Sequence, residues 1–268
     1  MSRSKRSAVQ RYHDRVAGRY DQSYDDKYWR WHDALTWEYL KPFLPREARA
    51  TILDLGCGTG KWAARLLKSG YHVVCVDISA NMLDQTRLKV EEIGATERAQ
   101  FVQADLCDLA ALPEGDAVMV VALGDPICCT TSPSRAMKEI RQALRDDGVL
   151  VATFDNKLAA LDFYLERGNV EEFEKFLRDG RTHWLTKDAR EQFEITTFDP
   201  TELRAMIERA GFEVLDLVGK TVLPMRHHRH LLQSPVDRRR WAGIERSLCR
   251  DPSAIGLASH IQVACRKR

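Results

Sequence analysis

The residues best suited to chemistry are carboxylates and glycines at the ends of apolar segments. Residues 51–60 read TILDLGCGTG, so an apolar segment leads to Asp54 and then to glycines at alternate positions. A glycine-rich turn after a strand brings backbone N–H groups close to a ligand. Asp54 at the entrance of this loop would repel a diphosphate and suits a cationic ligand. The loop therefore predicts a small ligand that carries a positive charge.

Two further carboxylates continue this pattern. Asp77 ends the apolar segment 72–77, where it is placed to accept hydrogen bonds from both hydroxyls of a ribose. Asp105 stands in QADL after the next apolar segment, where it is placed to meet an adenine amino group. A nucleoside with a positively charged tail satisfies all three carboxylates. S-adenosylmethionine is such a ligand, because it contains adenine, ribose, an ammonium and a sulfonium but no phosphate.

Five segments, in this order, resemble the class I S-adenosylmethionine-dependent methyltransferases. They read ILDLGCGTG, VDISANML, VQADL, VVALGD and LRDDGVLV, and they span about residues 50–155. VAGRYDQSY at 16–24 resembles the N-terminal segment of the ubiquinone- and menaquinone-biosynthesis type, in which a tyrosine helps to close the cofactor site. The resemblance implies that S-adenosylmethionine is bound by Tyr20, Asp54, Gly56, Cys57, Gly58, Asp77, Ile78, Asp105, Leu106, Ala122 and Leu123.

Other classes fit these motifs less well. The GxGxG spacing and Asp54 disfavour an oxidoreductase that uses NAD, for which GxGxxG is typical. A methyltransferase of nucleic acids would be expected to carry an Asn/Asp-Pro-Pro-aromatic motif where this chain has GDPICC. A non-catalytic protein that binds S-adenosylmethionine stays open as an alternative. We expect an enzyme.

The order of elements predicts a doubly wound, Rossmann-like α/β fold. The predicted strands lie at 51–56, 72–77, 99–105, 116–123 and 149–155, with helices at 61–70, 81–94 and 135–148. These strands are nearly all apolar, as in a parallel sheet that is buried on both faces. A helix at 201–210, a strand at 212–218 and the alternating segment SHIQVACRK follow. We therefore expect a mostly parallel, seven-stranded sheet with an antiparallel last strand.

Less regular segments surround this core. We expect four regions: an N-terminal helical lid (1–48), a cofactor-binding core (49–155), an inserted helical and hairpin lid (156–200), and a C-terminal part of the core (201–268) with a second insertion at 221–257. Ligands of open α/β sheets bind beyond the carboxyl ends of the strands. Insertions that follow strands should therefore lie over the site.

These variable segments supply the candidates for the acceptor side. We expect catalytic roles for Tyr24, His32, His183 and Glu194, and substrate-binding roles for Trp29, Trp184, Arg226, His227 and Arg229. Arginine and protonated histidine suit a carboxylate or a phosphate. The specific hypothesis is C-methylation of isopentenyl diphosphate or a related prenyl diphosphate, with aromatic rings stabilising the carbocation. O- or N-methylation of a neutral metabolite is the alternative.

Composition limits the remaining possibilities. The formal charge is +2 and no basic tract dominates, which argues against general nucleic-acid binding and leaves room for a local anion site. We expect a small-molecule acceptor. The longest apolar stretch, residues 117–123, is too short for a membrane span, and the basic N-terminus lacks the apolar segment of a secretory signal. The seven cysteines have no metal-binding spacing, so we expect reduced thiols, a cytoplasmic location and no metal site. The oligomeric state stays open.

Overall fold

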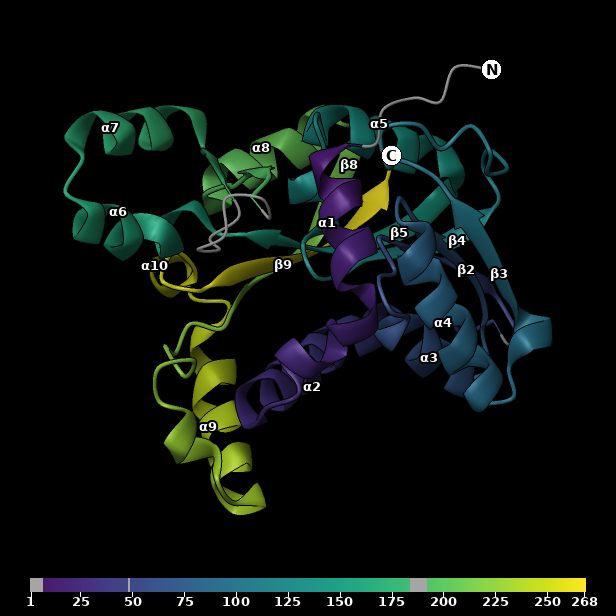
Figure 1. Ribbon diagram of the computed structural model, residues 1–268, viewed down its shortest axis with the longest axis horizontal. Coiled ribbons are helices and arrows are strands. Elements are labelled where there is room, and N and C mark those ends of the chain that lie inside the picture. Colours follow the sequence, from purple (N-terminus) through teal and green to yellow (C-terminus); the bar gives the residue numbers. More distant parts are fainter. Residues whose placement is uncertain (1–6, 48, 184–191) are drawn as a thin grey trace.

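The computed structural model describes residues 7–47, 49–183 and 192–268, and its centre is a seven-stranded sheet (Figure 1). The strand order is β3-β2-β1-β4-β5-β9-β8. The strands are β1 (Thr51–Leu55), β2 (His72–Asp77), β3 (Ala99–Gln103), β4 (Ala117–Ala122), β5 (Leu144–Asp155), β8 (Phe212–Lys220) and β9 (His260–Lys267). β9 runs antiparallel to β5 and β8, whereas β1 to β5 pair in parallel. The predicted Rossmann-like fold is therefore confirmed.

Helices cover both faces of the sheet. Alternate side chains of a strand point to opposite faces, and those of the parallel strands are apolar on both, so both faces must be buried. Ile52 of β1 packs with α3 (Lys61–Lys68) and α4 (Ala80–Glu92). Its neighbour Leu53 packs with α5 (Pro133–Ala143) and α8 (Pro200–Arg209). Both residues are at most 5% exposed, which explains why the parallel strands are almost entirely apolar.

One element boundary differs from the prediction. The sequence predicts a helix over 135–148, but α5 ends at Ala143 and β5 begins at Leu144. Leu144 is fully buried and pairs with Ala117 of β4. The extended backbone at Leu144 buries this side chain in the sheet core, and this tertiary packing outweighs the helical periodicity of the segment.

The remaining helices form two lobes outside the sheet, as Figure 1 shows. In one lobe, α2 (Lys27–Leu40) lies beside α9 (Pro235–Leu248), and the short helix α10 (Pro252–Ile255) contacts β8. The first helix, α1 (Ala8–Val16), packs against α4. The other lobe contains α6 (Leu161–Arg167), α7 (Val170–Asp179) and the hairpin of β6 (Arg181–His183) with β7 (Glu194–Thr196). No helix in the described ranges has the length and apolar character needed to cross a membrane.

Buried aromatic residues attach the first lobe to the sheet. Tyr28 and Trp31 of α2 pack with Val218 at the end of β8, with Met225 and with Leu232. Trp31 also donates a hydrogen bond from Nε1 to the backbone carbonyl of Arg238 in α9, at 3.2 Å. This packing joins α2 to the segment after β8, and both segments lie at the edge of the sheet where β8 ends.

Candidate active site

The glycine-rich loop after β1 is bent so that open space lies in front of it. Gly56, Gly58 and Gly60 all have positive φ angles, of 67°, 56° and 80°. A Cβ atom at Gly56 would lie 2.4 Å from the Cβ atom of Pro126, so this glycine permits close packing. A Cβ atom at Gly58 would meet nothing within 4 Å. Gly58 therefore faces the space that a ligand would fill.

Asp77 joins this loop to the end of β2. Its Oδ2 atom accepts a hydrogen bond from the backbone N–H of Gly58, and its Oδ1 atom accepts one from Ser79, both at 2.9 Å. Each carboxylate oxygen can accept a second hydrogen bond. Asp77 is thereby fixed in position and keeps acceptor capacity for a ribose diol.

Asp105 is held in a similar way after β3. Its Oδ1 atom accepts a hydrogen bond from the backbone N–H of Cys107 at 2.8 Å. Asp105 and the neighbouring Leu106 both line the cavity, next to Ile78. This end of the cavity thus combines a fixed carboxylate with apolar surface, as an adenine requires.

Asp54 lies beneath the loop. It is 1% exposed, and neither of its carboxylate oxygens has a hydrogen-bond partner in the described parts of the chain. Burial raises its pKa to about 7. A buried carboxylate without a partner is costly unless a cation compensates it. Asp54 does not itself line the cavity, so it would compensate the ammonium of S-adenosylmethionine from behind the loop.

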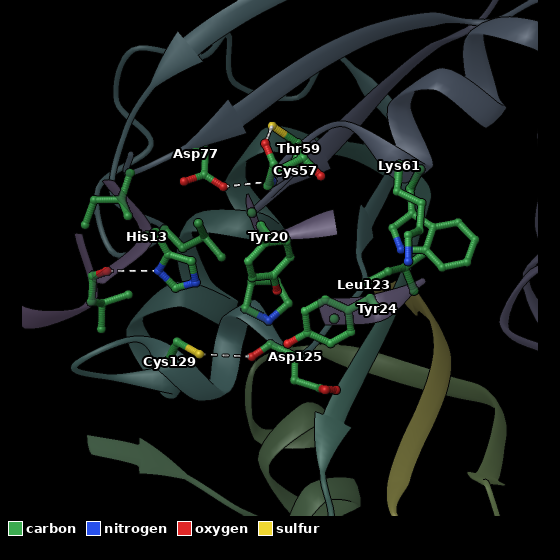
Figure 2. Close-up of a pocket in the computed structure, with 18 of the residues that line it drawn as sticks. His13, Tyr20, Tyr24, Cys57, Thr59, Lys61, Asp77, Leu123, Asp125 and Cys129 are labelled. Carbon is green, nitrogen blue, oxygen red and sulfur yellow. Dashed lines mark hydrogen bonds between the residues drawn. The ribbon is translucent and has the colours of Figure 1, made fainter. Parts of the chain in front are cut away.

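The donor residues and the acceptor residues share one cavity of about 240 Å³ (Figure 2). Its donor end is lined by Tyr20, Gly56, Cys57, Gly58, Asp77, Ile78, Asp105, Leu106 and Leu123. Ala122 is fully buried at the end of β4 and lies behind this surface. Nine of the eleven residues predicted for the cofactor thus line one cavity, whereas Asp54 and Ala122 do not. Their binding roles stay predictions.

Four polar side chains at the edge of the sheet line the part of the cavity that we call the acceptor end. Asp125 follows β4, Asp155 ends β5, Lys220 ends β8 and His260 begins β9, and all four line the cavity. His260 pairs in register with Asp155 on one side and with Lys220 on the other. Its Nδ1 atom lies 2.9 Å from Oδ2 of Asp125 and 3.7 Å from Oδ1 of Asp155. We call these four residues the charged row.

Burial and mutual charge set the ionisation of the charged row. Burial alone would raise the pKa of Asp125, but the charges of His260 and Lys220 lower it to about 2. Burial and the charge of Asp125 raise the pKa of Asp155 to about 7. Burial would lower the pKa of His260, yet the two carboxylates raise it above its usual value. At neutral pH an ionised Asp125 therefore faces a histidine that holds its proton readily.

Lys220 has few partners for a buried cation. The residue is 2% exposed, and burial lowers its pKa to about 8. Its Nζ atom donates a hydrogen bond to Oγ1 of Thr36 at 2.9 Å. Within the described ranges, no carboxylate oxygen lies within 4 Å of Nζ. Because an ammonium has three donors, Lys220 keeps donor capacity for a ligand in the cavity.

Aromatic residues of the N-terminal segment form a wall of the cavity. The ring centres of Tyr20 and Tyr24 are 4.8 Å apart, and those of Tyr24 and Trp29 are 4.9 Å apart. Figure 2 shows the two tyrosines beside Asp125. His32 also lines the cavity, and burial together with the charge of Lys220 lowers its pKa to about 3. The structure thus places Tyr24, Trp29 and His32 of the predicted acceptor residues in the cavity.

The predicted basic residues lie outside the cavity lining. Arg226, His227 and Arg229 are exposed. The guanidinium of Arg226 lies 5.7 Å from the ring centre of Trp29, and Arg229 donates a hydrogen bond to Asp26 at 2.7 Å. The basic segment therefore borders the cavity through Trp29 without lining it.

The predicted residues of the inserted hairpin lie on another surface. His183 and Glu194 face each other across β6 and β7, and both are exposed. Glu194 pairs with Arg181 at 3.1 Å. Trp184 lies outside the described residues. The structure does not bring His183 or Glu194 to the cavity lining, so their catalytic roles stay predictions.

The sequence reasoning missed the charged row, although a signal for it exists. Asp125 and Asp155 follow strands at the same edge as Asp54 and Asp77. His260 begins the one strand that was expected to run antiparallel, so its first residue belongs at this edge as well. The order of the strands could thus have identified these residues as candidates.

The fold and the donor site together define a class I S-adenosylmethionine-dependent methyltransferase. Residues 52–148 match the family model described as a methyltransferase domain. This match agrees with the glycine loop, with the fixed carboxylates Asp77 and Asp105, and with the strand order of the sheet. The chain is an enzyme of this class, and S-adenosylmethionine is its cofactor.

Relatives of this chain act on different acceptors. It is 25% identical over 241 residues to the tRNA 5-carboxymethoxyuridine methyltransferase of Escherichia coli O157:H7, covering 87% of each chain. It is 29% identical over 146 residues to the demethylmenaquinone methyltransferase of Leptospira interrogans, covering 52% of this chain and 56% of the relative. The solved geranyl diphosphate C-methyltransferase of Streptomyces coelicolor A3(2) has the same fold, with a TM-score of 0.56 and 12% identity, covering 88% of this chain and 79% of that one. The two sequence relatives support the class, the solved structure supports the fold, and the acceptors that they are named for differ.

Proposed function

We propose that this enzyme transfers a methyl group to a small acceptor that carries a carboxylate, and that the Lys220 ammonium binds this carboxylate. The observation that carries the proposal is the lone hydrogen bond of Lys220. Its Nζ atom is buried in the cavity wall and donates to Thr36 alone among the described residues. The nearby charge of Asp125 acts on Lys220 without a direct ion pair, and an anionic acceptor would supply that pair.

A single carboxylate suits this end of the cavity better than a diphosphate. Asp125 is ionised, and Asp155 lies beside it in the charged row. These carboxylates would repel a group with two or more negative charges. The basic residues proposed for a diphosphate, such as Arg226, lie outside the cavity lining. A prenyl diphosphate, the acceptor named for one structural neighbour, therefore serves as the competing arm of the test.

The residues of the cavity explain what the protein must contribute to methyl transfer. A sulfonium methyl group is already activated, so the protein has to align the acceptor and exclude water. Asp77 and Asp105 would hold the ribose and adenine, and Asp54 would compensate the ammonium. Tyr20 and Tyr24 would enclose the space between donor and acceptor.

A second candidate is a carboxylate attached to a tRNA nucleotide. Two observations favour it. The Escherichia coli relative is named for a tRNA acceptor, and the exposed Arg226 borders the cavity through Trp29, with Arg229 hydrogen-bonded to the backbone carbonyl of Arg226. The nucleotide would have to leave its stack to reach the buried Lys220. Such an acceptor would also bind the Lys220 ammonium. Unlike a small molecule, it would need the basic residues Arg226 and Arg229 to bind the rest of the tRNA.

The test is a methyl-transfer screen with S-adenosylmethionine labelled in the methyl group. The arms are small aromatic and aliphatic carboxylates, prenyl diphosphates, neutral phenols and amines, and unfractionated tRNA. We expect turnover in the carboxylate arm, and turnover that is confined to prenyl diphosphates or to neutral acceptors would refute the proposal. Turnover of tRNA that falls tenfold or more in an Arg226→Ala, Arg229→Ala variant would favour the second candidate. Tight cofactor binding without transfer in any arm would also refute the proposed class of acceptor.

A further inference from the structure

The charged row also contains a group that can take a proton. We propose that His260 is the proton acceptor of methyl transfer, and that Asp125 and Asp155 hold its imidazole in position. The inference rests on the proposed function and adds to it a second requirement for the acceptor. It applies to an acceptor atom that loses a proton when it is methylated.

The geometry of His260 is that of a base held by carboxylates. Its Nδ1 atom faces Oδ2 of Asp125 at 2.9 Å and Oδ1 of Asp155 at 3.7 Å. These are ion-pair distances, and Nδ1 is not aligned for a hydrogen bond to a described residue. The negative charge of the carboxylates favours the tautomer with its proton on Nδ1, which leaves Nε2 on the other side of the ring for the acceptor. When Nε2 gains a proton, the imidazolium lies against two carboxylates that stabilise its charge.

The other titratable groups around His260 support this assignment. Lys220 pairs with His260 across β8 and β9, and its positive charge opposes protonation of the imidazole. The ring centre of His32 lies 5.5 Å away, from α2. Because its pKa is lowered to about 3, His32 stays neutral and is a poor proton acceptor at neutral pH. Of the two histidines, His260 is the one whose neighbours favour proton uptake.

The register of β8 and β9 sets the spacing of the acceptor's groups. Lys220 and His260 lie directly opposite each other, and such pairs have Cβ atoms about 5 Å apart. Both side chains line the same cavity of about 240 Å³, so a carboxylate at Lys220 and an O–H or N–H group at His260 would belong to one compact molecule. The ring contacts of Tyr20, Tyr24 and Trp29 favour a flat acceptor. We infer a hydroxy- or amino-substituted aromatic carboxylate whose two groups are close neighbours.

The proposed step is balanced. A lone pair of the acceptor oxygen or nitrogen forms a bond to the methyl carbon of S-adenosylmethionine. The bond between this carbon and the sulfur breaks, and its electron pair stays on sulfur, which gives S-adenosylhomocysteine. The proton of the acceptor moves to Nε2 of His260 and is later released to water.

The first experiment compares acceptors of known geometry. The probes are 2-hydroxybenzoate and 2-aminobenzoate, with 4-hydroxybenzoate, 4-aminobenzoate and phenol as controls. We expect transfer to at least one of the two 2-substituted compounds, at ten times the rate of its 4-substituted isomer or more. Equal rates for these isomers, or no transfer to either 2-substituted compound, would overturn the acceptor geometry.

The second experiment replaces the base. His260→Gln keeps a side chain of similar size and should lower kcat about 10²- to 10⁴-fold at neutral pH, the range typical of a lost general base. The wild-type rate should rise with pH as the imidazole loses its proton, and this limb should be absent in His260→Gln. In Asp155→Asn the limb should move to lower pH, because a carboxylate that raises the pKa is gone. A merely structural role of His260 would lower the rate without changing the profile, and that result would overturn the proposal.

A third measurement does not depend on the acceptor. ¹⁵N spectra of the histidine rings, recorded with S-adenosylhomocysteine bound, should show a pKa of His260 that falls in both Asp125→Asn and Asp155→Asn. An unchanged pKa of His260 in these variants would overturn the assignment. A cation site would overturn it too, and its signs would be broadening of the His260 signals by Mn²⁺ together with loss of activity in the presence of a chelator. Transfer that depends on Lys220 but not on His260 would refute this inference alone. Transfer to neutral acceptors that depends on His260 would refute the proposed carboxylate instead.

Discussion

Replacing Lys220 by methionine should make the protein more stable and the enzyme less active. Methionine has a similar length and no charge, so Lys220→Met removes the buried ammonium while largely filling its space. In the folded protein the pKa of Lys220 falls from 10.5 to about 8, with burial as the main cause. This difference corresponds to about 3 kcal/mol at about 1.4 kcal/mol per pKa unit. The hydrogen bond to Thr36 offsets about 1 kcal/mol of it.

We therefore expect the free energy of unfolding at pH 7 to rise by about 1 to 3 kcal/mol in Lys220→Met. The sign of its pH dependence follows from linkage. Between pH 8 and 10.5 the unfolded chain holds the proton and the folded protein does not, so the wild type gains stability as pH rises through this window. The advantage of the methionine variant should therefore be complete below about pH 8 and disappear by about pH 10.5.

Activity should change in the opposite direction. Loss of one hydrogen bond to a charged group costs about 1.5 to 3 kcal/mol, so kcat/KM for a carboxylate acceptor should fall roughly ten- to 150-fold. The Kd for S-adenosylmethionine should stay within about twofold, because Lys220 belongs to the acceptor end. The measurements are urea unfolding at several pH values, methyl-transfer kinetics and calorimetric titration with the cofactor.

Lys157→Met is the matched control. Lys157 is also buried, at 5% exposed, but it pairs with Glu202 at 2.5 Å and does not line the cavity. Breaking this pair should lower stability and leave acceptor kinetics unchanged. If Lys220→Met is less stable than the wild type, burial of the Lys220 ammonium does not destabilise the fold as we argue. If its kcat/KM equals that of the wild type, Lys220 does not bind the acceptor.

Three further predictions concern the donor side. Asp77→Ala should weaken binding of S-adenosylmethionine by about 2 to 4 kcal/mol in calorimetry, because it removes charge-assisted hydrogen bonds to the ribose; unchanged affinity would exclude the ribose role. Both glycines have positive φ angles, so alanine at either position should cost stability through backbone strain. Gly56→Ala should cost more because its Cβ atom would also clash with Pro126, whereas Gly58→Ala should in addition lower cofactor affinity at least tenfold; thermal melts and cofactor titrations would separate the two effects. Hydrogen exchange in 8–40 should slow when S-adenosylhomocysteine binds, if this segment is a lid; protection confined to the core strands would count against it.

Local motifs in the sequence identify most of the residues that line the donor end of the cavity. Asp77 and Asp105 each follow an apolar strand, and the glycines of the loop are required by backbone geometry. Alternation of apolar strands and helices likewise predicted the sheet. The helix over 135–148 was too long, since periodicity alone does not show that Leu144 becomes part of a strand beside Ala117.

The acceptor half was harder to predict because its residues come together only in the folded sheet. Lys220 and His260 are 40 positions apart in the sequence and become neighbours through the register of β8 with β9. Tracts such as 226–230 are conspicuous in the sequence, yet their side chains are exposed. Lys220 is a single lysine at the end of a strand, and nothing in the sequence marks it as a site residue. Its proposed role follows from the burial of its ammonium and from its few hydrogen-bond partners.

The aromatic wall and the charged row come from different parts of the chain, and this separation has an evolutionary consequence. Tyr24 and Trp29 belong to the N-terminal segment, whereas Lys220 and His260 belong to strands of the sheet. Substitutions in the N-terminal segment can therefore alter the size and shape of the accepted molecule while the proton-transfer chemistry is inherited intact. We expect a directed-evolution library restricted to 20–32 to yield variants with new acceptor ranges, each still dependent on the strand residues.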